Sequence, residues 1–174
     1  MPNWCFNRVT VSGDPAEMDK FISECFIRRS DDNSLEFSFA KVLPIPDAIK
    51  DIRFGGTRDE TGKMRSHWWE VKNPDGTVTQ VPLSDAEIEA FRAEHGEADT
   101  YNWCIRYWDT KWDVCSFNLT FKDEERIEME FDTAWSPPGN VLRTLLDRYP
   151  ELSFRWFYDE PGMGIYGYLE KELD

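Results

Sequence analysis

The side chains best suited to binding a ligand lie in one segment, NWCIRYWDTKWD, at positions 102–113. Three tryptophans and a tyrosine fall within these twelve positions, and asparagine, aspartates and a lysine lie between them. Indole rings can bury a large apolar area or hold a cation against their faces. The spacing of Trp103 and Tyr107 places both on one face of a helical turn, and Trp112 is expected to start the following strand. The segment therefore predicts either an aromatic part of the core or the lining of a binding groove.

Two interpretations of this segment are compatible, because some rings can be buried while others line a cleft. In the first, the rings pack beneath an insertion formed by residues 53–100 and hold it to a sheet. In the second, Lys111 lies over a ring face and Asp113 offers a carboxylate to a ligand. The candidate binding cleft then consists of Trp108, Lys111, Trp112, Asp113 and Trp135.

Trp135 lies in a second distinctive segment, FDTAWSPP, at residues 131–138. The segment leads into a helix, and the free N–H groups of a helix start can bind an anion. More often a side chain caps them, and Ser136 is placed to do so. The two prolines stiffen the entry. We therefore expect a rigid strand-to-helix corner here rather than an anion site.

The sequence predicts no metal site, no cofactor and no catalytic residue. Its four cysteines form no CxxC pair, and neither histidine lies near them in the sequence. We expect buried free thiols. The motifs of serine hydrolases, zinc proteases, P-loop proteins and dinucleotide-binding proteins are absent from the sequence. His67 lies close to Glu70 and could act as a base, but we expect an ordinary solvated position in a hairpin. We therefore expect a protein that is not an enzyme.

The charge balance narrows the class of partner. The chain has 34 acidic and 20 basic residues and a net charge of −14. Phosphate groups of nucleic acids and anionic membranes would be repelled, so we expect a protein partner, no direct nucleic-acid binding and no membrane association. With no signal peptide and no apolar run long enough to span a bilayer, we expect a cytoplasmic protein. An RNA-binding sheet would show basic and aromatic side chains, whereas Glu36, Glu128, Glu130 and Asp132 are expected on the open face here.

The hydrophobic pattern predicts an α+β fold. Alternating apolar residues predict strands near residues 4–12, 35–39, 115–121, 127–132, 152–158 and 164–169. Helical periodicity predicts helices at 15–29, near 46–52 and after Ser136, and Asp14 is placed to cap the first of them. We expect one domain over residues 1–174, with a ferredoxin-like antiparallel sheet and two helices on one face. Residues 53–100 are expected to form a large insertion, with a loop at 55–63, a hairpin and an acidic helix that begins with a capping box of Ser84 and Glu87.

Four ordered segments resemble one known family. They are MPNWCFNRVTVSG at the start, FAKVLPIP at 39–46, WDTKWD at 108–113 and FDTAWSPP at 131–138. Together they are similar to phage- and plasmid-borne proteins that carry a YubB-type ferredoxin-like domain. The resemblance implies that fold, an origin in mobile elements and a small residue such as glycine at position 109, where this chain has aspartate. It implies no activity, and fold alone gives none.

These observations leave three hypotheses for the function. We favour a non-enzymatic binding or accessory module of a mobile element. The first alternative is an acidic decoy that presents carboxylates to a DNA-binding host protein. The second is a small-ligand or hydrolytic site in a tryptophan-lined cleft.

Overall fold

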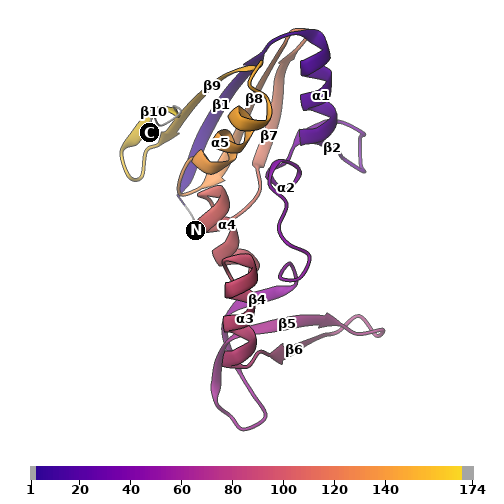
Figure 1. The fold of residues 1–174 in the computed structure, drawn as a ribbon, viewed down its shortest axis with the longest axis vertical. Coiled ribbons are helices and arrows are strands. Elements are labelled where there is room, and N and C mark those ends of the chain that lie inside the picture. The colour runs from indigo at the N-terminus through magenta and orange to yellow at the C-terminus, as the bar shows by residue number, and fades with distance from the viewer. Residues whose placement is uncertain (1–2, 170–174) are drawn as a thin grey trace. The chain divides into compact units, whose positions relative to one another are not determined.

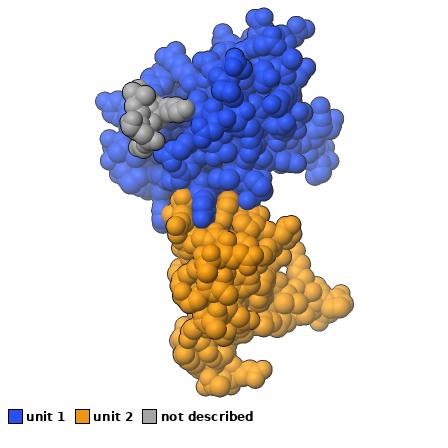
Figure 2. Space-filling model, viewed as in Figure 1, with its two compact units in different colours: residues 1–44, 107–174 blue, residues 45–106 orange. Residues whose placement is uncertain are grey.

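The structure, a computed structural model, describes residues 3–169 and divides the chain into two compact units. Unit 1 comprises residues 1–44 and 107–174, and unit 2 comprises residues 45–106 (Figure 2). The segment 53–100 predicted to be an insertion lies within unit 2. Among the described residues, no helix is long and apolar enough to cross a membrane.

Unit 1 is built on a five-stranded antiparallel sheet (Figure 1). The strands follow the order β10-β9-β1-β8-β7. Their bounds are Trp4–Ser12 for β1, Cys115–Lys122 for β7, Arg126–Ala134 for β8, Ser153–Glu160 for β9 and Ile165–Leu169 for β10. Helices α1 (Pro15–Cys25) and α5 (Gly139–Arg148) cover one face. Strands β9, β1, β8 and β7 with these two helices have the ferredoxin-like arrangement, which confirms the predicted fold class.

The core lies between the two helices and the sheet. Alternate residues of the central strand β1 are buried, and Val9 and Val11 are fully enclosed, as the pattern predicts. Asn7 also points into this core, because it shares the strand's two-residue period. Its amide donates to Thr133 Oγ1 at 2.9 Å and accepts from Trp156 Nε1 at 3.0 Å. A buried polar network therefore joins β1 to both of its neighbours.

The predicted helix at 15–29 is too long. Asp14 caps α1 as expected, but the helix ends at Cys25. Strand β2 (Phe26–Arg28) follows and pairs with β3 (Leu35–Phe37) in a separate two-stranded sheet, so the predicted place of Glu36 on the open face is wrong. Phe39 starts the short helix α2 (Phe39–Val42) instead of ending the strand.

Unit 2 contains a three-stranded antiparallel sheet and helical segments. Strands β4 (Ile52–Arg58), β5 (Met64–Lys72) and β6 (Val78–Pro82) follow one another in order. The predicted hairpin is confirmed as β5 and β6. The loop expected at 55–63 is instead the end of β4 and a tight turn, where Asp59 Oδ1 accepts from the backbone of Thr61 and Lys63. The helix expected near 46–52 is a series of turns.

Helix α3 (Asp85–His95) has the predicted capping box, in which Ser84 and Glu87 satisfy each other's backbone N–H groups. It ends at Gly96, whose φ of 82° favours glycine. Helix α4 (Thr100–Trp108) follows and contains the first part of the tryptophan segment.

Candidate functional site

The two distinctive segments of the sequence meet in unit 1. One is the loop after α4, and the other joins β8 to α5. Thr110 Oγ1 donates to the carbonyl of Ala134 at 3.0 Å and accepts from its N–H at 3.2 Å. The Ser136 hydroxyl donates to the carbonyl of Asp109. These bonds hold the two loops against each other.

Both loops contain a residue in the left-handed region of backbone space. Asp109 has φ 64°, and Trp135 has φ 76°. The left-handed conformation at position 109 explains why the resemblance implies a small residue such as glycine there. Aspartate tolerates this conformation better than most other residues. For a residue as large as tryptophan, such a conformation is strained and persists only where the surroundings impose it. The Trp135 N–H also donates to the carbonyl of Asn3 at 2.9 Å.

Asp109 caps α5, so the prediction that Ser136 does so is wrong. The carboxylate of Asp109 accepts from the backbone N–H of Asn140 at 2.7 Å and from its side-chain amide at 2.9 Å. The residue before the helix, Pro138, makes no side-chain cap bond. The negative charge of this carboxylate also interacts favourably with the positive end of the helix dipole.

Three half-exposed tryptophans and one lysine gather beside these loops. We call Trp4, Lys111, Trp112 and Trp135 the tryptophan cluster. The three tryptophans are 40%, 43% and 45% exposed, in that order. Lys111 Nζ lies 4.3 Å from the centre of the Trp112 ring and 3.9 Å from the centre of the Trp135 ring. Trp4 backs Trp112 at a centroid distance of 6.1 Å.

The structure does not bring the other two predicted cleft residues into this cluster. Trp108 is only 2% exposed, and its indole N–H donates to the carbonyl of Leu43 at 2.9 Å. Asp113 accepts from the backbone N–H of Phe39 at 2.7 Å and from Ser38 Oγ at 2.8 Å. It therefore holds the start of α2, which explains why Phe39 leaves the strand.

Trp4 is the cluster residue that the sequence interpretation missed. It is the first residue of β1, and it alternates with the buried Cys5. The predicted strand period already placed it on the face opposite the core, but its neighbours across the sheet could not be known. Trp112 was expected to start a strand, whereas β7 begins at Cys115.

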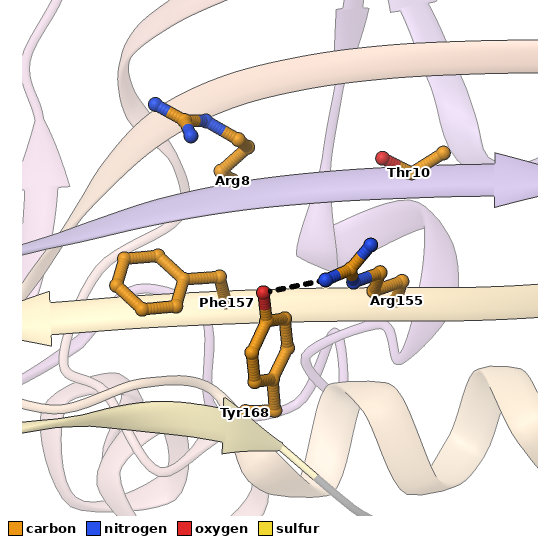
Figure 3. Close-up of a pocket in the computed structure, with 5 residues that line it drawn as sticks. All are labelled: Arg8, Thr10, Arg155, Phe157 and Tyr168. Carbon is orange, nitrogen blue, oxygen red and sulfur yellow. Dashed lines mark hydrogen bonds between the residues drawn. The ribbon is translucent and has the colours of Figure 1, made fainter.

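A cavity lies on the face of the sheet that α1 and α5 leave uncovered, here called the open face. Five side chains from three strands line a cavity of about 260 Å³ (Figure 3). The strand register explains their meeting: Arg8 lies opposite Phe157, Thr10 opposite Arg155, and Phe157 opposite Tyr168. Residues directly opposite in paired strands share one face.

Aromatic rings and guanidinium groups contact each other within this cavity. Arg155 Nη2 donates to the Tyr168 hydroxyl at 2.8 Å, and its guanidinium lies 5.0 Å from the centre of that ring. The Phe157 and Tyr168 rings meet edge to face at 5.5 Å. Figure 3 shows these side chains on the same side of β9 and β10. These contacts fix Arg155, Phe157 and Tyr168 relative to one another.

Strand β8 contributes acidic side chains to the same open face. Glu128, Glu130 and Asp132 lie opposite Thr10, Arg8 and Phe6, which confirms their predicted place. Arg8 Nε lies 3.0 Å from Glu130 Oε1, and Arg126 pairs with Glu128. Asp132 adds to burial in raising the pKa of the nearby Cys115 thiol. We call these three carboxylates the acidic row.

The prediction that His67 is solvated is wrong. It is buried in unit 2, where Nε2 lies 3.0 Å from Asp99 Oδ2 and Nδ1 lies 2.9 Å from Ser66 Oγ. Asp99 also accepts from the backbone and side-chain amide of Asn102. The pair therefore ties β5 to the start of α4. Glu70 is bonded to Arg53 instead, at 3.0 Å.

The prediction of buried free thiols is confirmed for three of the four cysteines. Cys5, Cys25 and Cys104 are buried, and Cys115 is half-buried. Burial raises the pKa of the Cys5 thiol to about 11. Among residues 3–169, no group of three metal-ligating side chains could hold an ion.

The fold and these surfaces define a ferredoxin-like α+β domain with an open, aromatic sheet face. Residues 107–173 match the sequence model of a family described as a ferredoxin-like domain in Api92-like protein. That match includes Lys111, Trp112 and Trp135 of the tryptophan cluster. "Ferredoxin-like" denotes this topology and no iron–sulfur cluster.

No curated protein matches the chain. A solved structure, that of protein api92 from Yersinia pseudotuberculosis, is similar at 12% identity. The similarity covers 97% of this chain and 93% of that chain, with a TM-score of 0.49.

Proposed function

We propose that this protein is a non-enzymatic binding module that takes a protein partner on the open face of its sheet. The observation that carries the proposal is the composition of that face. Aromatic and arginine side chains surround a cavity, and the acidic row lies beside them. Tyrosine, phenylalanine, tryptophan and arginine are the side chains enriched in protein interfaces.

Asp132 and the net charge of the whole chain favour a partner with basic side chains. Arg8 and Arg126 each pair with a carboxylate of the acidic row, whereas Asp132 lies opposite Phe6 in β1 and Cys115 in β7. The whole chain adds a net charge of −14, which steers cations toward it. We therefore propose a protein whose contact surface offers lysine or arginine to the acidic row and an apolar side chain to the cavity.

The acidic-decoy hypothesis is less well supported by this arrangement. A decoy needs carboxylates in an unbroken run, as phosphates are spaced along a nucleic acid. On the open face, Arg8 and Arg126 interrupt the acidic row through ion pairs. The resemblance of the four segments to phage and plasmid proteins supports an accessory role in a mobile element.

A photo-crosslinking experiment tests the proposal. A photoreactive phenylalanine replaces Phe157 in the cavity or, as a control, Phe91 on α3. Partners crosslinked only from position 157 are identified and purified. Their affinities are then measured for the wild type, Tyr168→Ala and Glu130→Lys, with Glu94→Lys as a matched charge reversal on α3.

We expect Tyr168→Ala and Glu130→Lys to weaken binding at least tenfold, because each removes a central contact. Glu94→Lys should leave binding unchanged. Equal losses for Glu130→Lys and Glu94→Lys would show that net charge alone attracts the partner. Single-stranded RNA that bound the open face in competition with the partner would also contradict the proposal.

A further inference from the structure

The ammonium group of Lys111 is held by aromatic rings. Its Nζ lies over the rings of both Trp112 and Trp135, at 4.3 and 3.9 Å from their ring centres. Such distances are typical of a cation held by the negative faces of aromatic rings. The structure therefore already shows a cation at this position, supplied by the chain itself.

We propose that the tryptophan cluster is a binding site for a methylated ammonium group, and that Lys111 occupies this site when no ligand is bound. The site does not depend on the proposed binding of a protein to the open face. Lysine carries its charge on a flexible four-carbon stem, so its ammonium group can leave without a change in the backbone.

The chemistry of the site favours a methylated cation over a primary one. Indole faces attract positive charge but accept no conventional hydrogen bond. The ammonium of lysine has three N–H donors and is strongly hydrated, so it loses much water when it enters. A trimethylammonium group has no N–H donor and presents methyl groups to the rings. Aromatic cages recognise quaternary ammonium ligands for this reason.

The cluster is built at a cost that core packing does not explain. Three large rings remain between 40% and 45% exposed, although an indole buried in a core would contribute more to stability. The Trp135 backbone lies in the left-handed region at φ 76°. Strained residues of this kind gather at ligand-binding and active sites.

Hydrogen bonds hold the backbone of the strained segment from both sides. Thr110 bonds both backbone groups of Ala134, and Ser136 bonds the carbonyl of Asp109. On the other side, the Trp135 N–H donates to Asn3. We therefore expect the two rings to keep their separation when Lys111 is removed.

The ligand can come from two sources with the same chemistry. One is a free quaternary ammonium compound, and the other is trimethyllysine in a protein segment. The experiment uses tetramethylammonium for the first and a short peptide with one trimethyllysine for the second. The same peptide with unmodified lysine is the comparison.

Binding is measured from the indole N–H signals of the tryptophans in ¹H–¹⁵N NMR spectra during titration. The proteins are the wild type, Lys111→Ala and Lys63→Ala, which removes the same charge from unit 2. The Trp108 signal is an internal control, because that indole is buried and bonded to Leu43. An unchanged Trp108 signal shows that a variant keeps its fold.

We expect Lys111→Ala to bind a trimethylammonium probe about five- to thirtyfold more tightly than the wild type, which corresponds to about 1–2 kcal/mol. The shifts should be confined to Trp4, Trp112 and Trp135, and Lys63→Ala should bind like the wild type. Binding of tetramethylammonium and peptide alike supports a small-molecule ligand, whereas binding of the peptide alone supports a protein segment. Equal affinity of the wild type and Lys111→Ala, equal affinity for unmodified lysine, or no binding of either probe overturns the proposal.

Discussion

The strain at Trp135 leads to a prediction that reverses a general rule of protein stability. Replacing a residue by glycine usually destabilises a protein more than replacing it by alanine, because glycine gains more freedom in the unfolded chain. Trp135, however, has φ 76°. A left-handed conformation costs a non-glycine residue about 1–2 kcal/mol. The entropy term that opposes glycine is about 0.4–1 kcal/mol. We therefore expect Trp135→Gly to be more stable than Trp135→Ala by about 1 kcal/mol.

Trp112 provides the matched control. It lies in the same cluster with a similar exposed fraction and has no positive φ. At this position we expect the usual order, with Trp112→Ala more stable than Trp112→Gly by about 0.4–1 kcal/mol. Both pairs lose the same ring and the same contact with Lys111, so only the backbone term differs within each pair.

Urea unfolding followed by far-UV circular dichroism measures the four variants. The two members of a pair should share one dependence on urea, so the midpoints give their order directly. If alanine is the more stable replacement at both positions, the Trp135 backbone is not strained. The argument that the cluster is held at an energetic cost would then be wrong.

Three further predictions follow from the described contacts. Asn7→Leu should lower the free energy of unfolding by about 2–4 kcal/mol, because it leaves the Trp156 indole N–H buried without its acceptor. In urea unfolding, adding Trp156→Phe should recover part of this loss. If the losses of the two single variants simply add in the double variant, the network is contradicted. Asp113→Ala should cost about 2 kcal/mol and speed amide exchange at the start of α2, whereas unchanged exchange would exclude the capping role. A hydrogen bond from the Thr61 hydroxyl is the largest influence that lowers the pKa of Asp59 from 3.8 to about 2. The Asp59 carboxylate therefore contributes to stability above pH 3.8, and this contribution is lost as the pH falls toward 2. Asp59→Asn should flatten that part of a plot of unfolding free energy against pH.

The sequence predicted those features that depend on neighbours along the chain. The alternation in β1 identified its buried face, and Ser84 with Glu87 marked the start of α3. Lys111, Trp112 and Trp135 were grouped from their residue types, and the structure brings them together. Each of these inferences rests on local periodicity, local hydrogen bonding or the chemistry of a side chain.

The features that the sequence did not predict depend on partners far away in the chain. Asp113 caps a helix 74 residues before it, and Asp109 caps one 31 residues after it. Neighbouring residues alone suggest that such carboxylates face solvent or a ligand, because the sequence does not show which distant backbone groups they contact. Arg155 and Tyr168 enter the cavity only through the pairing of β9 with β1 and β10.

Strand β1 links the two surfaces for which we propose binding. Its first residue, Trp4, backs the tryptophan cluster, and Arg8 and Thr10 line the cavity on the open face. The register with β8 and β9 fixes these side chains in one row, because all of them share the two-residue period opposite the core. A shift of β1 by one residue would bury the row and expose Val9 and Val11. The buried bonds of Asn7 to both neighbouring strands oppose that shift, so a core polar network sets the geometry of the binding face.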